Sequence, residues 1–228
     1  MKKGLVIVLG LLMTLGAVSS ATAANNFVRY KVVVTVTTPE GDKTGSSVRE
    51  AVAYTESRLI PQQGGTFYNI TKGEAVVVNL GKKRPLLFVL LGQQREAKLV
   101  TEMFSKETSR IILRPDQYPQ MVYFENLNNP KTVRSARRAK IEGGQWKDGL
   151  NYGGHVVSVW LDKKIFGKGV NLKSIAIEPT HDHITTGIEK YLPWLPKVKM
   201  TYLNGSNFSA SNDLYASLGG SDFKRGIK

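Results

Sequence analysis

The stretch that most constrains the fold is 28–38, in which apolar and polar side chains alternate. Apolar residues occupy every second position from Val28 to Val36, and Arg, Lys and Thr separate them except at Val33. Successive side chains of a β-strand point to opposite faces of a sheet, so this period of two predicts a half-buried strand. The turn-forming residues 39–42 follow, and we expect residues 46–54 to form the returning strand.

The rest of the chain repeats this β character and adds one clear helix. Residues 86–91 are apolar on both faces, which predicts a central strand. Residues 93–107 carry apolar side chains at helical spacing, and we expect their charged residues, Glu96 among them, to lie largely outside the apolar stripe. The sequence therefore predicts a mainly β single-domain fold, a sandwich or open barrel with about one amphipathic helix. An α+β arrangement is the alternative.

The amino terminus has the pattern of a secretory signal peptide. Lys2 and Lys3 precede an apolar run over residues 5–18, and Ala-Thr-Ala at positions 21–23 matches the small-residue site that a signal peptidase cleaves. A membrane anchor is the alternative, but the run is shorter than the roughly 20 apolar residues that a bilayer span needs. We therefore expect export, with the periplasm or cell envelope as destination.

The expected cleavage divides the sequence into three parts. Residues 1–23 form the signal peptide, and residues 24–200 are expected to form the β-rich globular domain. Residues 201–228 are rich in Asn, Ser and Gly and show little periodicity, so we expect a flexible tail. The chain has no cysteine, which excludes disulfides, thiolate nucleophiles and cysteine-bound metals.

Positive charge is the strongest compositional signal. The full sequence has 32 basic and 18 acidic residues, and loss of Lys2 and Lys3 with the signal peptide leaves a formal charge of +12. A positive field attracts anionic partners, and in the envelope these are lipopolysaccharide, peptidoglycan or anionic lipid. Export argues against nucleic acid as the partner, because a protein outside the cytoplasm rarely meets it.

The densest positive run covers residues 131–147, where Glu142 is the single acidic residue. A run of this kind either binds an anionic partner or forms a solvated face, and both readings stay open. The candidate binding residues in it are Lys131, Arg134, Arg137, Arg138, Lys140 and Trp146.

Two further groups of residues are candidates for chemistry. His181 and His183 are two positions apart, so on an extended strand their imidazoles would point the same way and share a zinc ion, with His155 as a third ligand. A chance pair in a loop is the alternative. Glu50 shares a strand face with Val48, so it is either a buried carboxylate with a partner or a residue at the edge of the core.

Two segments resemble an uncharacterised family of exported bacterial proteins. They are residues 38–48, which contain TPEG and TGSSV, and residues 185–195, which read TTGIEKYLPWL. The resemblance implies export and supplies neither an activity nor catalytic residues.

These observations favour a non-enzymatic envelope protein that binds an anionic component through a basic surface and needs no cofactor. The P-loop, dinucleotide-binding, G-x-S-x-G and H-E-x-x-H signatures do not occur in the sequence. The alternative is a periplasmic hydrolase, metal-dependent in one version, that uses Glu50, His181 or His183.

Overall fold

The computed structural model describes residues 26–56, 65–104, 106, 109–147, 150–152, 154–198, 201–207 and 213–226. The predicted signal peptide lies outside these ranges.

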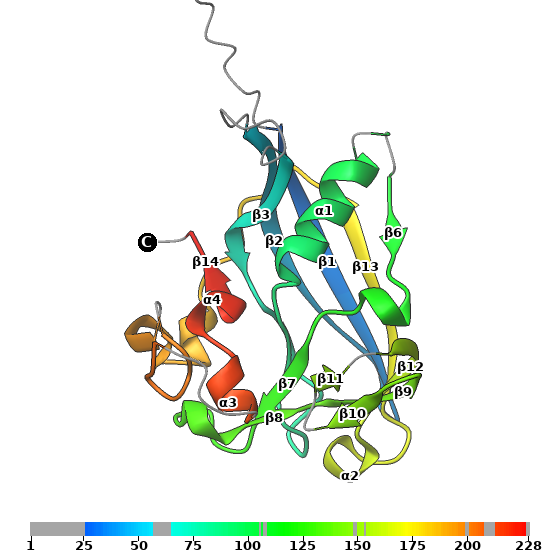
Figure 1. The fold of residues 1–228 in the computed structure, drawn as a ribbon. Helices are drawn as coiled ribbons and strands as arrows, with labels where there is room; N and C mark the ends of the chain where they lie inside the picture. The colour runs from blue at the N-terminus through cyan, green and yellow to red at the C-terminus, as the bar shows by residue number, and fades with distance from the viewer. Residues whose placement is uncertain are drawn as a thin grey trace, which may run out of the picture.

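A six-stranded antiparallel sheet forms one layer of the molecule (Figure 1). Its strands, in spatial order, are β14 (Lys224–Arg225), β3 (Gly65–Glu74), β2 (Gly41–Glu56), β1 (Asn26–Thr38), β13 (Asn171–Pro179) and β6 (Ile111–Ile112). In β1, Tyr30, Val32, Val34 and Val36 are all buried and the residues between them are half-buried, so the predicted alternation is confirmed. The β1–β2 hairpin turns at Pro39 and Glu40, as the turn chemistry predicted.

A second antiparallel sheet packs on the first. It contains β4 (Val76–Val78), β5 (Leu87–Val89), β7 (Met121–Phe124) and β8 (Val133–Ser135), in that order. The β2 and β4 backbones approach closely at Gly45, where an added Cβ would lie 2.3 Å from the carbonyl oxygen of Val77. Strand β5 lies between β4 and β7 and all three of its residues are buried, which confirms the predicted central strand.

The second sheet is buried on both faces because it separates two cores. Leu87, Val89 and Met121 face the six-stranded sheet and share a core with β1 and with α1 (Gln93–Phe104). Phe88 and Val122 point the other way, into a second core that the C-terminal part of the chain covers. The helix α1 lies across the six-stranded sheet beside the second sheet, as Figure 1 shows.

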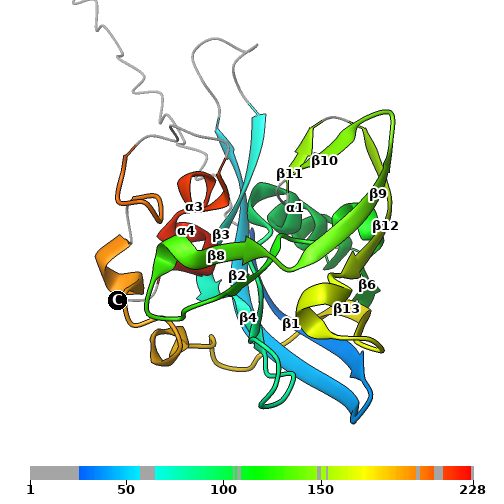
Figure 2. The same cartoon turned by 90° about the horizontal axis from the view of Figure 1, so that it is seen from below.

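A ribbon of four short strands extends from the side of the molecule (Figure 2). Strand β9 (Arg137–Glu142) pairs with β12 (His155–Leu161), and β10 (Gln145–Lys147) pairs with β11 (Leu150–Tyr152) between them in the chain. We call these four strands the ribbon. The short helix α2 (Lys163–Phe166) follows β12 directly.

The expectation of a flexible tail is wrong for the described part of residues 201–228. Leu203, Leu214, Leu218 and Phe223 are buried in the second core, and the segment contains α3 (Leu214–Ser217) and α4 (Gly220–Phe223). Each four-residue helix carries one or two apolar anchors, so the segment folds on the sheet without a periodic pattern that sequence analysis would detect. The remaining short helices are η2 (Pro115–Gln117), η3 (Pro130–Thr132), η4 (Ile188–Lys190) and η5 (Leu195–Val198).

The fold is therefore mainly β, with two packed sheets and one main helix, as the sequence predicted. Within the ranges given above, no helix combines the length and the apolar character needed to cross a membrane.

Candidate functional site

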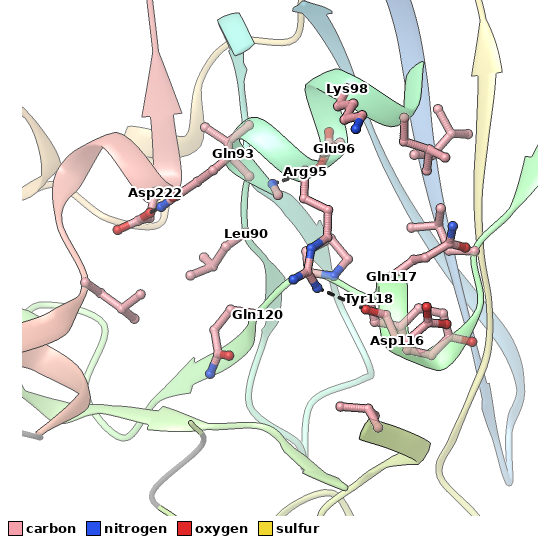
Figure 3. A pocket seen from close by; sticks show the side chains of 18 of the residues that line it. Leu90, Gln93, Arg95, Glu96, Lys98, Asp116, Gln117, Tyr118, Gln120 and Asp222 are labelled. Carbon is pink, nitrogen blue, oxygen red and sulfur yellow. Dashed lines mark hydrogen bonds between the residues drawn. The ribbon is translucent and has the colours of Figure 1, made fainter. Parts of the chain in front are cut away.

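A cleft of about 680 Å³ lies between α1, the segment around η2, the start of β12 and α4 (Figure 3). This volume falls within the range of small-molecule sites in proteins. The polar residues on its walls include Gln93, Arg95, Asp116, Gln117, Gln120 and Asp222. No sequence pattern marks these six residues, because they come from three separate segments that only the fold brings together.

The helix that forms one wall of the cleft is held by a buried ion pair. Nη1 of Arg49 donates to both carboxylate oxygens of Glu96, at 2.7 and 2.9 Å. The hydroxyl of Tyr30 donates to the same carboxylate at 2.7 Å, and the backbone N–H of Gly92 donates to it at 2.8 Å. The prediction that Glu96 lies outside the apolar stripe is therefore wrong, since this residue is buried with its carboxylate fully hydrogen-bonded.

Two other carboxylates of the cleft are also held by donors of the protein. Arg114 donates to both oxygens of Asp116, at 3.2 and 3.3 Å, and this contact holds the pKa of Asp116 below its ordinary value. Asp222 accepts the backbone N–H of Gly219 at 2.8 Å and a hydrogen bond from the side chain of Gln93. Burial nevertheless raises the pKa of Asp222 above its ordinary value.

Gln93 occupies an unusual backbone conformation. Its φ is +52°, the one positive value for a residue other than glycine among the described residues. Left-handed backbone is uncommon outside glycine and costs free energy unless the surroundings hold it. In Figure 3 the Gln93 side chain reaches from the start of α1 to Asp222 on the opposite wall, so this strained residue closes one end of the cleft.

The ribbon presents a second candidate site on its solvent-facing side. Arg138 and Lys140 on β9 lie directly opposite Trp160 and Ser158 on β12, which places all four on one face. We call these four residues the outer ribbon face. Arg138, Lys140 and Trp160 are exposed, and 39% of the surface of Trp160 is accessible to solvent. Asp162 accepts from Nε of Arg138 at 2.9 Å and from the backbone N–H of Lys164 at 3.0 Å, so the basic start of α2 adjoins this face.

The structure brings only some of the six predicted binding residues together. Arg138 and Lys140 share the outer ribbon face, whereas Arg134 lies on β8 and pairs with Glu125 at 3.2 Å. Arg134 and Arg138 line a common pocket of about 480 Å³. Lys131 is exposed on η3. Trp146 lies on β10, and its side chain is outside the described part of the structure.

Arg137 points to the opposite side of the ribbon from Arg138. Its guanidinium donates to the carbonyl oxygens of Tyr118 and Pro119, each at 3.2 Å, and to Oε1 of Gln120 at 3.1 Å. Burial lowers the pKa of Arg137 to about 10. This arginine joins the ribbon to the wall of the cleft.

Glu50 is buried and lies between two cations on neighbouring strands. Arg29 on β1 and Lys72 on β3 are its direct cross-strand partners, with nitrogen to carboxylate oxygen distances of 3.7 and 2.8 Å. Burial alone would raise the pKa of Glu50, but hydrogen bonds from Lys72 and Thr71 outweigh it and hold this pKa below its ordinary value. The contacts with Arg29, Lys72 and Thr71 explain structurally why a carboxylate can be buried at position 50.

His181 and His183 are both exposed and follow the end of β13 in a loop, where the strand geometry that would align two imidazoles is absent. Asp182 between them pairs with Lys31 at 3.5 Å. His155 begins β12 and lines the cleft. Among the residues that the structure describes, no group of three His, Asp or Glu side chains is placed to hold a metal ion.

The two segments that carry the predicted family resemblance touch each other. The backbone N–H of Val48 donates to the hydroxyl of Thr185 at 2.8 Å, and the N–H of Thr185 donates to the carbonyl of Val48 at 3.2 Å. Comparison of the whole chain with protein-family models, curated proteins and solved structures finds no match. The resemblance stays a prediction.

Proposed function

We propose that this chain is an exported envelope protein that binds an anionic lipid or polymer of the cell surface through the outer ribbon face. The observation that supports this most directly is the pairing of Arg138 with the exposed Trp160 across β9 and β12, beside Lys140. A cationic group next to an exposed indole suits the boundary between water and anionic head groups.

The charge around this face is largely uncompensated. Lys140, Lys163 and Lys164 are exposed, and none of them has an ion-pair partner among the described residues. Arg138 pairs with Asp162, which keeps its guanidinium at the surface and fixes its position. The formal charge of +12 that remains after loss of Lys2 and Lys3 adds long-range attraction to anionic surfaces.

Sedimentation with lipid vesicles tests the proposal. The purified protein is mixed with vesicles of phosphatidylglycerol and phosphatidylcholine, or of phosphatidylcholine alone, at rising salt. We expect binding to the anionic vesicles only, and we expect it to weaken as salt screens the charges. Purified lipopolysaccharide and peptidoglycan serve as the other two ligands. Equal binding to neutral vesicles, or no binding to any of these ligands, contradicts the proposal.

Two variants and a control locate the surface. Lys140→Gln and Trp160→Ala each remove one contact of the outer ribbon face and should weaken anionic binding several-fold. Lys106→Gln removes the same charge from an exposed position just after α1 and should leave binding unchanged. If all three variants bind as the parent does, another part of the protein carries the interaction.

The alternative, a metal-dependent periplasmic hydrolase, has its own test. Elemental analysis of the purified protein and of the His181→Ala and His183→Ala variants measures bound zinc directly. Stoichiometric zinc in the parent that both substitutions remove would favour the hydrolase over the binding protein. Export is tested separately by the amino-terminal sequence of the protein recovered from the periplasm, which we expect to begin near Ala24.

A further inference from the structure

We propose that the cleft between α1 and the ribbon is a second binding site, which takes a small organic anion with a carboxylate or phosphate head group and an apolar body. It shares no residue with the outer ribbon face. The inference is independent of the proposed function.

The carboxylates of the cleft already receive hydrogen bonds from the protein, and several donors of the cleft remain available. Glu96 is held by Arg49, Asp116 by Arg114, and Asp222 by Gly219 and Gln93. A ligand therefore gains little by offering donors. A ligand binds more favourably when its polar groups are acceptors, because they can accept hydrogen bonds from the donors of the cleft that are still free.

Arg95 is the main donor that remains. Its guanidinium points into the cleft in Figure 3, and Nη1 donates to the backbone carbonyl of Asp116 at 3.2 Å. Within the described residues Arg95 has no carboxylate partner, because the side chain of Asp116 is turned to Arg114. The carbonyl contact holds the arginine in place and leaves its positive charge uncompensated, which suits a planar carboxylate or a phosphate.

Two glutamines of the segment around η2 add donors to the cleft. Oε1 of Gln117 accepts the backbone N–H of Arg114 at 2.9 Å, and Oε1 of Gln120 accepts from Arg137 at 3.1 Å. Both amides are thereby oriented with their NH2 groups as the remaining polar atoms. Nε2 of Gln120 is shielded from solvent and has no hydrogen-bond partner among the described residues, so this wall has an excess of donors.

Apolar side chains account for the second half of the ligand, although Lys98 and His155 line the cleft as well. Leu90, Leu99, Leu113, Val156 and Leu218 come from different segments and line the same cleft as Arg95. A pocket that combines apolar walls with convergent polar groups is the usual form of a small-molecule site. A fully polar anion would leave these walls without a partner.

Calorimetric titration of the purified protein with four probes tests this inference. Octanoate and octyl phosphate carry both features, octanol lacks the charge and acetate lacks the apolar chain. We expect octanoate or octyl phosphate to bind at least tenfold more tightly than octanol and acetate, and the tighter of the two identifies the head group. Equal affinity for octanoate, octyl phosphate and octanol, or no binding of any probe, overturns the inference.

The role of Arg95 is tested by Arg95→Gln, which should reduce the affinity for the charged probes at least tenfold and leave octanol unchanged. Arg110→Gln is the matched control, because Arg110 is exposed and lies outside the cleft. A change that affects charged and uncharged probes equally would mean a general distortion and would count against a head-group contact. Loss of vesicle binding in Lys140→Gln with unchanged octanoate binding would show that the two sites are separate.

Discussion

Arg49 on β2 and Glu96 on α1 form an ion pair from which solvent is excluded, with side chains 0% and 4% exposed. The guanidinium also donates to the carbonyl oxygens of Glu74 at 3.1 Å and Val89 at 3.3 Å. One arginine thus connects β2, the end of β3, β5 and α1. Gly73 permits this arrangement, since an added Cβ there would lie 2.7 Å from Cγ of Arg49.

Removal of one partner of this pair should destabilise the protein strongly. Arg49→Met or Glu96→Leu alone leaves the other charge buried without a partner, and we expect each to lower the free energy of unfolding by about 3–5 kcal/mol. The double variant should lose less than the sum of the two. Urea unfolding of the three variants completes the cycle, and strict additivity would mean that the pair is not energetically coupled.

The contact between β2 and β4 predicts a size limit at Gly45. An alanine Cβ at this position would lie 2.3 Å from the carbonyl oxygen of Val77, so the sheets must move apart. We expect Gly45→Ala to lower the free energy of unfolding by about 1–3 kcal/mol. Gly65→Ala is the control, because nothing lies within 4 Å of an added Cβ there, and its unfolding midpoint should be nearly unchanged. Equal effects of the two substitutions would contradict the steric explanation.

The local patterns of the sequence were sufficient to predict the regular elements β1 and α1. The alternation in β1 and the helical spacing in α1 reflect burial on one side of each element, and burial is what a periodic pattern reports. Trp194, which lies between Pro193 and Pro196, packs in the second core. Its ring lies 5.5 Å from that of Phe124, and its indole N–H donates to the carbonyl of Leu127 at 2.8 Å.

The polar groups inside the fold were not predictable in this way. Arg49 and Glu96 are 47 positions apart, and each resembles a surface residue when its own element is considered alone. Both faces of β2 are covered, since Val48 and Arg49 are both buried, so alternation does not reveal which side faces the main core. The donors of the cleft escape sequence analysis for the same reason, because their common location depends on long-range packing.

The start of η4 is capped by a residue far away in the sequence and not by its own neighbours. Thr186 and Glu189 have the spacing of a capping box, but the N–H groups of Gly187 and Ile188 donate to the carboxylate of Glu74 at 3.0 and 2.9 Å. Glu189 pairs instead with Lys224 on β14. A carboxylate on β3 thus performs the capping that a capping box would assign to Thr186 and Glu189.

The buried aromatic cluster predicts that the C-terminal segment contributes to stability. The Phe223 ring is fully buried and lies 5.9 Å from Phe124 and 6.0 Å from Trp194, centroid to centroid. We expect Phe223→Ala to lower the free energy of unfolding by about 3–5 kcal/mol. The control is Phe27→Ala, at a residue 56% exposed, with a change within about 0.5 kcal/mol. A small effect at Phe223 would mean that this segment does not cover the core in solution.

The raised pKa of Asp222 predicts that the protein loses stability as pH rises. Burial raises the pKa of this carboxyl in the folded protein above its value in the unfolded chain, so the folded state binds the proton more tightly. The resulting stabilisation is complete below the unfolded pKa, about 4, and is lost as pH rises through the folded pKa. Relative to Asp222→Asn, the parent should therefore lose free energy of unfolding as pH rises from about 4 towards neutrality.

The matched comparison is Asp42, for which the sign is opposite. The hydrogen bond from Lys173, at 2.6 Å, holds the pKa of Asp42 below its ordinary value, so its stabilisation is present at neutral pH and is lost as pH falls through the folded pKa. Relative to Asp42→Asn, the parent should gain stability as pH rises towards the unfolded pKa, about 4, and change little above it. Urea unfolding of the parent and both variants between about pH 2 and 7 measures the two slopes, each in its own pH range. Slopes of the same sign would show that burial does not control the proton affinity of Asp222.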